Sequence, residues 1–150
     1  MTSNDVSVRA ATLKDVEAIG RIYRAAIREG KDLNDKYWDK AIERGGIFVA
    51  EIEGIVIGFG GIDFGAMEQI RYLYVAPEHQ RSGLRVGLRI LRTLEAAARQ
   101  KGIELLRLHS TPNAVRFYEK AGYSAVELEH AIGHDHPGVE MAKKLASQVP

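Results

Sequence analysis

The stretch Val75-Ala-Pro-Glu-His-Gln-Arg-Ser-Gly-Leu-Arg-Val-Gly87 joins a strand-like run, residues 70–75, to a long amphipathic helical pattern that starts near Gly83. A polar turn with a glycine, placed where a strand passes into a helix, leaves backbone N–H groups without intrahelical partners. These amides lie at the positive end of the helix dipole, and together they form a site that suits phosphate. The stretch therefore predicts a turn that holds the phosphates of a cofactor.

The composition is that of an ordinary globular domain. The chain has 150 residues, of which 45% are hydrophobic and 27% charged, so we expect residues 1–150 to form one domain with a substantial core. The net charge of +1, without blocks of like charge, argues against nucleic-acid or membrane-surface binding. No apolar run approaches the roughly 20 residues of a membrane span, and no signal peptide is visible, so a cytoplasmic protein is expected.

Cysteine is absent from the sequence. Disulfides, thiolate metal ligands and cysteine nucleophiles are therefore excluded. A ping-pong reaction through a thiol ester on the protein is excluded for the same reason.

Hydrophobic periodicity divides the chain into alternating strands and helices. We expect strands at 6–10, 47–52, 55–62, 68–75, 103–109, 123–130 and 139–145, and helices at 12–28, 33–44, 83–100 and 114–121. Thr12 and Asp15 have the spacing of a capping box, and Gly30 is expected to end the first helix. In the second helix, Trp38 is interpreted as a core residue, with a place beside a substrate pocket as the alternative.

The connections between these elements predict an α/β fold with a mixed central sheet of about six to seven strands and flanking helices. Glu53-Gly54 is a tight-turn signal and predicts an antiparallel hairpin. Gly58, Gly60 and Gly61 inside the second hairpin strand indicate a bulge or a close backbone approach. The helix at 83–100 implies a parallel crossover, and a ligand is expected outside the carboxyl end of the strand that precedes the turn.

The turn matches neither a Walker loop nor a Rossmann turn. It resembles the acyl-CoA-binding motif of the GNAT superfamily of N-acetyltransferases, a strand ending Leu-x-Val-x-Pro and then Gln/Arg-x-x-Gly-x-Gly/Ala at a helix start. The matching residues are Leu73, Val75, Pro77, Gln80 and Gly83. The segment from Asn113 to Tyr123 resembles the family's Asn-x-x-x-x-Tyr-x-x-x-Gly-Phe/Tyr motif. The order of strands and helices also fits, so the resemblance covers nearly the whole chain.

The resemblance implies that acetyl-CoA is the acetyl donor. The cofactor-binding residues it implies are Leu73, Tyr74, Val75, Gln80, Arg81, Ser82, Gly83, Leu84, Arg85, Val86, Gly87, Asn113, Phe117 and Tyr118. The amides of residues 81–86 would hold the pyrophosphate, and the backbone of Leu73 and Val75 would face the thioester and the pantetheine arm. A backbone N–H aimed at the thioester carbonyl stabilises the oxyanion that forms when an amine attacks.

Tyr118 takes the family position of the general acid, which protonates the departing thiolate. The alternative is that Phe117 and Tyr118 only pack in the core, but the spacing to Asn113 and Gly122 favours the catalytic role. The resemblance does not choose a general base, because this role varies within the family. Glu68 and His109 are candidates on strands expected to be neighbours, and Asp63 at the end of the hairpin is a third.

Two features depart from the family pattern or lie outside it. Arg85 occupies the place of the last small residue of the turn, and Gly87 follows two residues later. Arg81, Arg85 and Arg89 are spaced four apart, so on a helix they would share one face, which we expect to meet phosphates. For Arg89 a solvated basic face is an equal alternative.

The loop with His130, His134, Asp135 and His136 matches no zinc pattern, so no metal is expected, and we interpret the loop as lining the acceptor pocket.

The function that follows is transfer of an acetyl group from acetyl-CoA to a primary amine by direct attack in a ternary complex. The acceptor is left open between a small-molecule amine, an amino acid, an antibiotic and a protein amino group. A homodimer is a further implication of the resemblance. Two alternatives stay open, a non-catalytic acyl-CoA-binding or sensing module and an interaction domain that uses the histidine loop.

Overall fold

The computed structural model describes residues 5–27, 33–65, 68–80, 84–126 and 138–146. The strands are β1 (Ser7–Ala10), β2 (Ile47–Ile52), β3 (Ile55–Asp63), β4 (Gln69–Val75), β5 (Leu105–Ser110), β6 (Ser124–Ala125) and β7 (Val139–Lys144). The α-helices are α1 (Val16–Ala26), α2 (Asp35–Arg44), α3 (Val86–Gln100) and α4 (Val115–Lys120). Short 3-10 turns, η1 (Leu13–Asp15), η2 (Pro77–His79) and η3 (Pro112–Ala114), precede α1, α3 and α4. Within these ranges, every helix is too short or too polar to cross a membrane.

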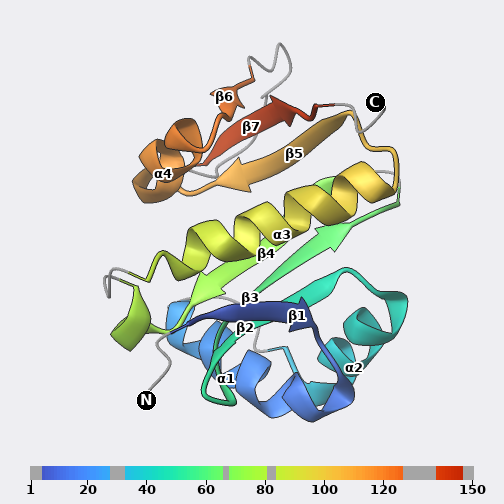
Figure 1. The fold of residues 1–150 in the computed structure, drawn as a ribbon, viewed down its shortest axis with the longest axis vertical. Helices are drawn as coiled ribbons and strands as arrows, with labels where there is room; N and C mark the ends of the chain where they lie inside the picture. The colour runs from blue at the N-terminus through green and yellow to red at the C-terminus, as the bar shows by residue number, and fades with distance from the viewer. Residues whose placement is uncertain (1–4, 28–32, 66–67, 81–83, 127–137, 147–150) are drawn as a thin grey trace.

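The described strands form one mixed sheet in the order β1-β2-β3-β4-β5-β7-β6 (Figure 1). β4 and β5 are parallel and are connected through α3, while the other neighbours are antiparallel. The predicted hairpin is confirmed, and Glu53 and Gly54 at its turn both have positive φ, 51° and 80°, as in a type I′ turn. The predicted fold class is therefore confirmed.

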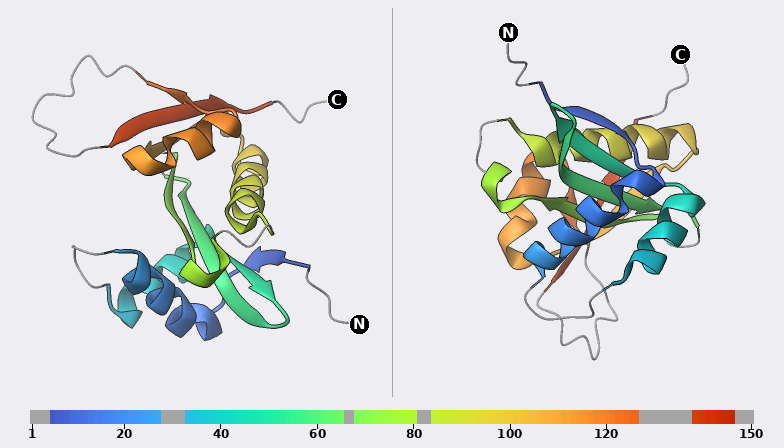
Figure 2. Two further views of the ribbon diagram at one scale, coloured as in Figure 1. Left: turned by 90° about the vertical axis from the view of Figure 1, so that its left-hand side faces the viewer. Right: turned by 90° about the horizontal axis from the view of Figure 1, so that it is seen from below.

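Helices lie on both faces of the sheet, with α1 and α2 on the face opposite α3 (Figure 2). On the α3 face, a Cβ added to Gly60 would lie 2.5 Å from Ile90 Cγ2 and 3.0 Å from Leu94 Cδ1, so the predicted close approach is confirmed. On the other face, the fully buried Trp38 packs edge-on against aromatic neighbours. They include Tyr23, Tyr37, Phe59 and Tyr72. Trp38 is thus a core residue, as predicted.

Several predicted boundaries are wrong for identifiable reasons. The third helix begins at Val86 and not at Gly83, because Arg85 has the left-handed backbone angles φ 54° and ψ 44°. β4 begins at Gln69, since Glu68 also has a positive φ of 46°. The predicted strand 103–109 is Leu105–Ser110, and the described part of the strand predicted at 123–130 is reduced to Ser124–Ala125. The predicted helix end at Gly30 lies outside the described residues.

β4 contains a bulge, and its pairing with β5 is short. Gly61 pairs with Tyr72 and Ile62 pairs with Ile70, which leaves Arg71 as the extra residue of a β-bulge. The parallel pairing of β4 with β5 is confined to Gln69 with Arg107 and Ile70 with Leu108. Beyond Ile70, the second half of β4 therefore pairs with β3 on one side and, among the described strands, with none on its β5 side.

Candidate functional site

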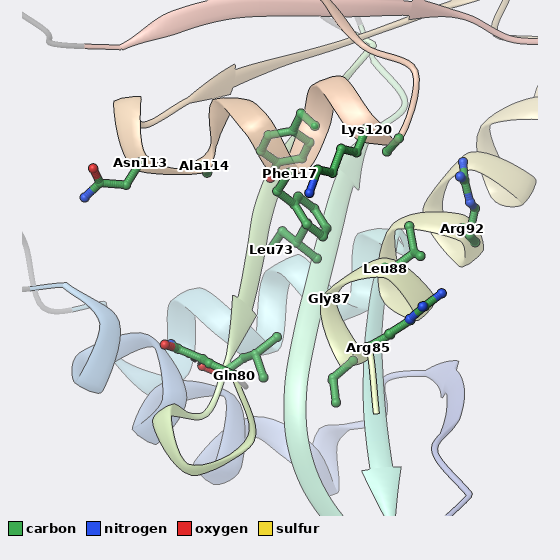
Figure 3. Close-up of a pocket in the computed structure, with 14 residues that line it drawn as sticks. Leu73, Gln80, Arg85, Gly87, Leu88, Arg92, Asn113, Ala114, Phe117 and Lys120 are labelled. Carbon is green, nitrogen blue, oxygen red and sulfur yellow. Dashed lines mark hydrogen bonds between the residues drawn. The ribbon is translucent and has the colours of Figure 1, made fainter. Parts of the chain in front are cut away.

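A cavity of about 870 Å³ lies between β4, the start of α3 and α4 (Figure 3). It is lined by Leu73, Val75, Gln80, Arg85, Val86, Gly87, Leu88, Arg92, Asn113, Ala114, Phe117, Tyr118, Lys120 and Ala121. Its volume falls within the range of about 300–1,000 Å³ that is typical of small-molecule sites. The cavity lies beside the carboxyl end of β4, which is the location expected from the order of elements.

The unpaired edge of β4 presents backbone groups to this cavity. The Ala76 N–H donates to the Ile57 carbonyl at 2.8 Å. Because backbone groups in an antiparallel pair alternate in direction, Tyr74 turns its N–H and C=O toward β3, whereas Leu73 and Val75 turn theirs away from it. Gln80 Nε2 donates to the Val75 carbonyl at 3.0 Å, which agrees with this direction. The Leu73 amide is thereby directed toward the cavity side.

The charged side chains that line the cavity are all cations. Arg85 precedes α3, Arg92 lies on α3, and Lys120 comes from α4 on the opposite wall (Figure 3). The described lining contains no carboxylate and no histidine. Such a lining favours an anionic ligand, and guanidinium groups suit phosphate in particular.

The start of α3 contradicts the prediction that Arg85 and Arg89 share one helical face, while Arg81 lies outside the described residues. Arg85 lies before the helix, in the left-handed region that favours glycine, while Gly87 lies in the first turn and lines the cavity. A Cβ on Gly87 would lie 3.5 Å from Phe117 Cζ, so the small residue keeps this wall open. Arg89 donates from Nε to the Leu84 carbonyl at 3.1 Å and from Nη1 to the Val6 carbonyl at 3.3 Å, and it does not line this cavity.

Tyr118 reaches the cavity from α4 and is buried, with 8% of its surface exposed. Its ring lies 5.1 Å from the ring of Phe117 and 5.8 Å from that of Tyr123. Burial raises the pKa of Tyr118 to about 12, and the nearby Tyr74 contributes a smaller increase. The phenol is therefore protonated at neutral pH and can donate a hydrogen bond into the cavity.

A buried carboxylate on α3, Glu95, supports the walls of this cavity. Its Oε1 accepts from Arg92 Nη1 at 2.8 Å, and its Oε2 accepts from the Tyr123 hydroxyl at 2.8 Å and from Lys143 Nζ at 3.2 Å. Lys143 Nζ also donates to the carbonyl of Ala121, a lining residue, at 2.9 Å. Burial alone would raise the pKa of Glu95, but these hydrogen bonds outweigh it, and the pKa is lowered.

The cavity brings together many of the residues expected to bind the cofactor, and their role stays a prediction. Those that line it are Leu73, Val75, Gln80, Arg85, Val86, Gly87, Asn113, Phe117 and Tyr118. Tyr74 packs on the opposite face, 5.5 Å from the Tyr23 ring and 5.6 Å from the Phe59 ring, and Leu84 is not a lining residue. Arg81, Ser82 and Gly83 lie outside the described residues.

Five lining residues were not anticipated from the sequence. They are Leu88, Arg92, Ala114, Lys120 and Ala121. Leu88 and Arg92 are four residues apart and lie on one face of α3, so the helical period relates these two residues to each other. Lys120 and Ala121 lie within the second motif, between Tyr118 and Gly122, and that motif alone does not specify which of its side chains face the cavity.

None of the three candidates for the general base, Glu68, His109 and Asp63, lines this cavity. The backbone carbonyl of Glu68 accepts from the Arg107 N–H at 3.4 Å. His109 Nδ1 lies 3.5 Å from Glu140 Oε1 on β7. β4 and β5 are neighbours as expected, but they do not place Glu68 and His109 together in the cavity lining.

The histidine loop with His130, His134, Asp135 and His136 falls outside the described residues. In the described ranges, no three metal-ligating side chains come together as a potential metal site.

Comparison with known proteins identifies the class. The family model described as an acetyltransferase (GNAT) domain matches residues 43–125, more than half of the chain. The chain therefore belongs to the GNAT family of acetyltransferases, as the two sequence motifs indicated. A search of curated protein sequences found no match.

Solved structures show the same fold at low sequence identity. Ard1 from Thermoplasma volcanium is 19% identical, with a TM-score of 0.78 over 95% of this chain and 99% of that chain. The yncA protein of Salmonella typhimurium, solved with acetyl-CoA, is 20% identical, with a TM-score of 0.77 over 98% of each chain. The PaiA N-acetyltransferase of Thermoplasma acidophilum, solved with coenzyme A, is 19% identical, with a TM-score of 0.75 over 93% of this chain and 99% of that chain.

Proposed function

We propose that residues 1–150 form one catalytic domain that transfers an acetyl group from acetyl-CoA to a primary amine by direct attack. The observation that carries this proposal is the cavity bounded by the free edge of β4, the first turn of α3 and Tyr118. Two proteins with this fold, yncA and PaiA, have been solved with acetyl-CoA and coenzyme A, respectively. Family membership supports the reaction class.

The lining divides into a part suited to phosphates and a part suited to the acyl end. Arg85, Arg92 and Lys120 supply cations for the phosphates of acetyl-CoA, and the N–H groups of the first turn of α3 add further donors. Leu73 and Val75 supply backbone groups along which the pantetheine amides bind. Asn113 adds a side-chain amide at the α4 wall.

The reaction then proceeds in one ternary complex. The amine nitrogen attacks the thioester carbonyl carbon, and the Leu73 N–H stabilises the oxyanion of the tetrahedral intermediate. The C–S bond breaks as the carbonyl re-forms, and coenzyme A leaves as a thiolate. The described lining of this cavity has no carboxylate or imidazole, so the proton released from the amine passes to a base outside this lining or to water.

Tyr118 donates its hydrogen bond to the departing thiolate. Burial raises the pKa of Tyr118 to about 12 and keeps the phenol protonated, so Tyr118 acts on the thiolate as a hydrogen-bond donor. That hydrogen bond strengthens as charge develops on sulfur. We therefore assign Tyr118 to stabilisation of the leaving group, with the final proton drawn from solvent.

Thiol release from acetyl-CoA across a panel of amines tests this function. We expect Tyr118→Phe to lower kcat by roughly 10- to 100-fold, because the hydrogen bond to the departing thiolate is lost. The KM for acetyl-CoA should change little, since the ring and its packing remain. A Tyr118→Phe enzyme with full kcat would remove Tyr118 from the mechanism, while binding of acetyl-CoA by titration would still test the cavity.

A non-catalytic acyl-CoA-binding module is the second candidate. The observation that favours it is that the described lining of this cavity contains no carboxylate and no histidine that could act as the general base. Tight acetyl-CoA binding without thiol release for any amine would establish this alternative. Amine-dependent thiol release would exclude it.

A further inference from the structure

A second cavity of about 480 Å³ lies between α2 and the paired ends of β3 and β4. It is lined by Tyr37, Ala41, Arg44, Gly45, Ile47, Ile62, Asp63, Phe64, Gly65, Arg71 and Tyr72. The α2 residues among them are spaced four and three apart, so a single face of the helix forms one wall. Tyr37, Phe64 and Tyr72 give the cavity flat aromatic surfaces.

The bulge in β4 accounts for the position of Arg71 in this lining. Ile70 packs in the core on the α3 face, and Tyr72 packs on the α2 face, so the usual alternation is interrupted between them. Bulges of this kind redirect a side chain at the edge of a site. Arg71 is that extra residue, and it lines the second cavity.

The charged groups of this cavity are not paired with each other. Among the described residues, neither Arg44, Arg71 nor Asp63 forms an ion pair. Their side-chain hydrogen bonds there go to the backbone: Arg44 Nε donates to the Lys40 carbonyl at 3.4 Å, and Asp63 Oδ1 accepts from the Gly65 N–H at 2.8 Å. Two guanidinium groups and one carboxylate leave a surplus of one positive charge in the lining.

We infer that this cavity binds the acetyl acceptor and that the acceptor is a small amine bearing a carboxylate, of the amino-acid class. The inference rests on the proposed acetyl transfer. Guanidinium groups bind a carboxylate in a bidentate manner, so Arg44 and Arg71 hold the acid group of the acceptor. A lining with surplus positive charge disfavours an amine without an acid group, because an ammonium ion would enter uncompensated.

The position of the cavity along β4 agrees with this assignment. The second cavity touches β4 at Arg71 and Tyr72, and the first touches it from Leu73 onward. Tyr72 packs on the α2 face and Leu73 on the α3 face, so the two cavities reach β4 at consecutive residues from opposite faces of the sheet. The volume fits a metabolite-sized ligand rather than a protein surface.

Trp38 provides a binding signal that is independent of turnover. It is the only tryptophan of the chain, and its ring lies 5.0 Å from Tyr37 and 5.2 Å from Tyr72, both of which line the cavity. The experiment titrates the protein with the twenty amino acids and, where they exist, their decarboxylated amines, and follows Trp38 emission except with fluorescent ligands. The same compounds are then compared in acetyl-CoA thiol release. We expect at least one amino acid to bind and react at least tenfold better than its decarboxylated counterpart.

Variants assign that preference to the two arginines. Arg71→Met and Arg44→Met should each weaken binding of the preferred amino acid by about tenfold and leave the affinity for acetyl-CoA unchanged. The affinity of Arg71→Lys for the preferred amino acid should lie between those of the unmodified protein and Arg71→Met, since lysine keeps the charge and loses the bidentate geometry. Arg21→Met, an exposed arginine on α1 that lines neither cavity, should behave as the unmodified protein.

The outcomes separate this inference from the proposed function. If no amino acid exceeds its decarboxylated counterpart, or if both methionine variants keep full affinity, the inference is overturned. Thiol release that is equal with amino acids and with carboxylate-free amines would overturn the inference about the acceptor while supporting acetyl transfer. Failure of acetyl-CoA itself to bind, measured by calorimetry, would overturn the proposed function instead.

Discussion

Asp15 and Glu95 are both buried carboxylates that accept hydrogen bonds from an arginine, yet they connect different parts of the molecule. Asp15 accepts from Arg9 at 2.8 and 2.9 Å and from the Thr12 N–H at 2.8 Å. Arg9 also reaches Glu51 on β2 at 3.2 Å. The arginine hydrogen bonds lower the pKa of Asp15, so this cluster fastens β1 to the first turn before α1 in its ionised form.

The Glu95 cluster differs because its partners include the walls of the large cavity. Arg92 and Ala121 line that cavity, and Lys143 joins Glu95 to the Ala121 carbonyl. No described residue of the Asp15 cluster lines either of the two cavities. We therefore expect the same chemistry, a carboxylate neutralised by cations, to affect stability alone at Asp15 and stability together with ligand binding at Glu95.

Removal of Glu95 has the largest expected effect. Glu95→Ala leaves Lys143 partly buried without its counter-charge and should lower the free energy of unfolding by about 3–5 kcal/mol, measured by urea denaturation. The KM for acetyl-CoA should rise as well, because Arg92 loses its anchor. Glu95→Gln keeps the shape and two of the hydrogen bonds, so its loss should be smaller. A loss below about 1 kcal/mol for Glu95→Ala would contradict the buried-cluster argument.

Asp15→Ala should cost less and should leave binding intact. It removes a helix-start acceptor and the partner of a half-exposed arginine, so we expect a loss of about 2 kcal/mol in the free energy of unfolding. The acetyl-CoA affinity, measured by calorimetry on the folded variant, should equal that of the unmodified protein. A weakened affinity would break the distinction between the two clusters.

The two clusters also differ in how far they could be predicted from sequence. The Thr12–Asp15 contact was predicted from spacing, because its two residues are three positions apart and belong to one local motif. Glu95 lies in a correctly predicted helix, but its partners Tyr123 and Lys143 are 28 and 48 residues away. Sequence periodicity reports which face of a helix is apolar, and it contains no information on which distant groups meet a buried carboxylate.

The same division holds for the fold. The hairpin at Glu53-Gly54 and the parallel crossover through α3 were predicted because turn chemistry and helix length are local properties. The start of α3 was predicted three residues too early, since Arg85 adopts a backbone conformation that is rare for residues with a side chain. The bulge at Arg71 and the second cavity were not predicted, because they depend on the register between β3 and β4.

Alkaline pH should separate the two clusters further, since only the Glu95 cluster contains a phenol. Burial, and then the charge of Glu95, raises the pKa of Tyr123 in the folded state. A raised folded-state pKa contributes stability that is complete below pH of about 10 and is lost as the pH rises. At pH 11 we expect Tyr123 to account for a loss of about 1 kcal/mol in the free energy of unfolding. In urea denaturation, Tyr123→Phe should therefore lose less stability at this pH than the unmodified protein does. Asp15→Ala should keep the full alkaline loss.

Arg85 and Arg92 extend the comparison to the cavity itself. Both line it. The Arg92 side chain is fixed by its hydrogen bond to Glu95, whereas the Arg85 backbone adopts the left-handed conformation, with φ 54°. For a residue with a side chain that conformation costs about 1 kcal/mol, and glycine avoids the cost but has more freedom in the unfolded chain. Arg85→Gly should therefore raise the free energy of unfolding by roughly 0.5 kcal/mol, while Arg85→Ala should not.

Both substitutions remove one cation from the cavity, so both should weaken acetyl-CoA binding by the same small factor, about three- to tenfold. Stability and affinity then move in opposite directions in Arg85→Gly, and only affinity changes in Arg85→Ala. Equal stability of the two variants would show that the backbone at this position is not strained. Unchanged affinity in both would show that Arg85 borders the cavity without meeting the phosphates, which would leave Arg92 and Lys120 as the cations that bind them.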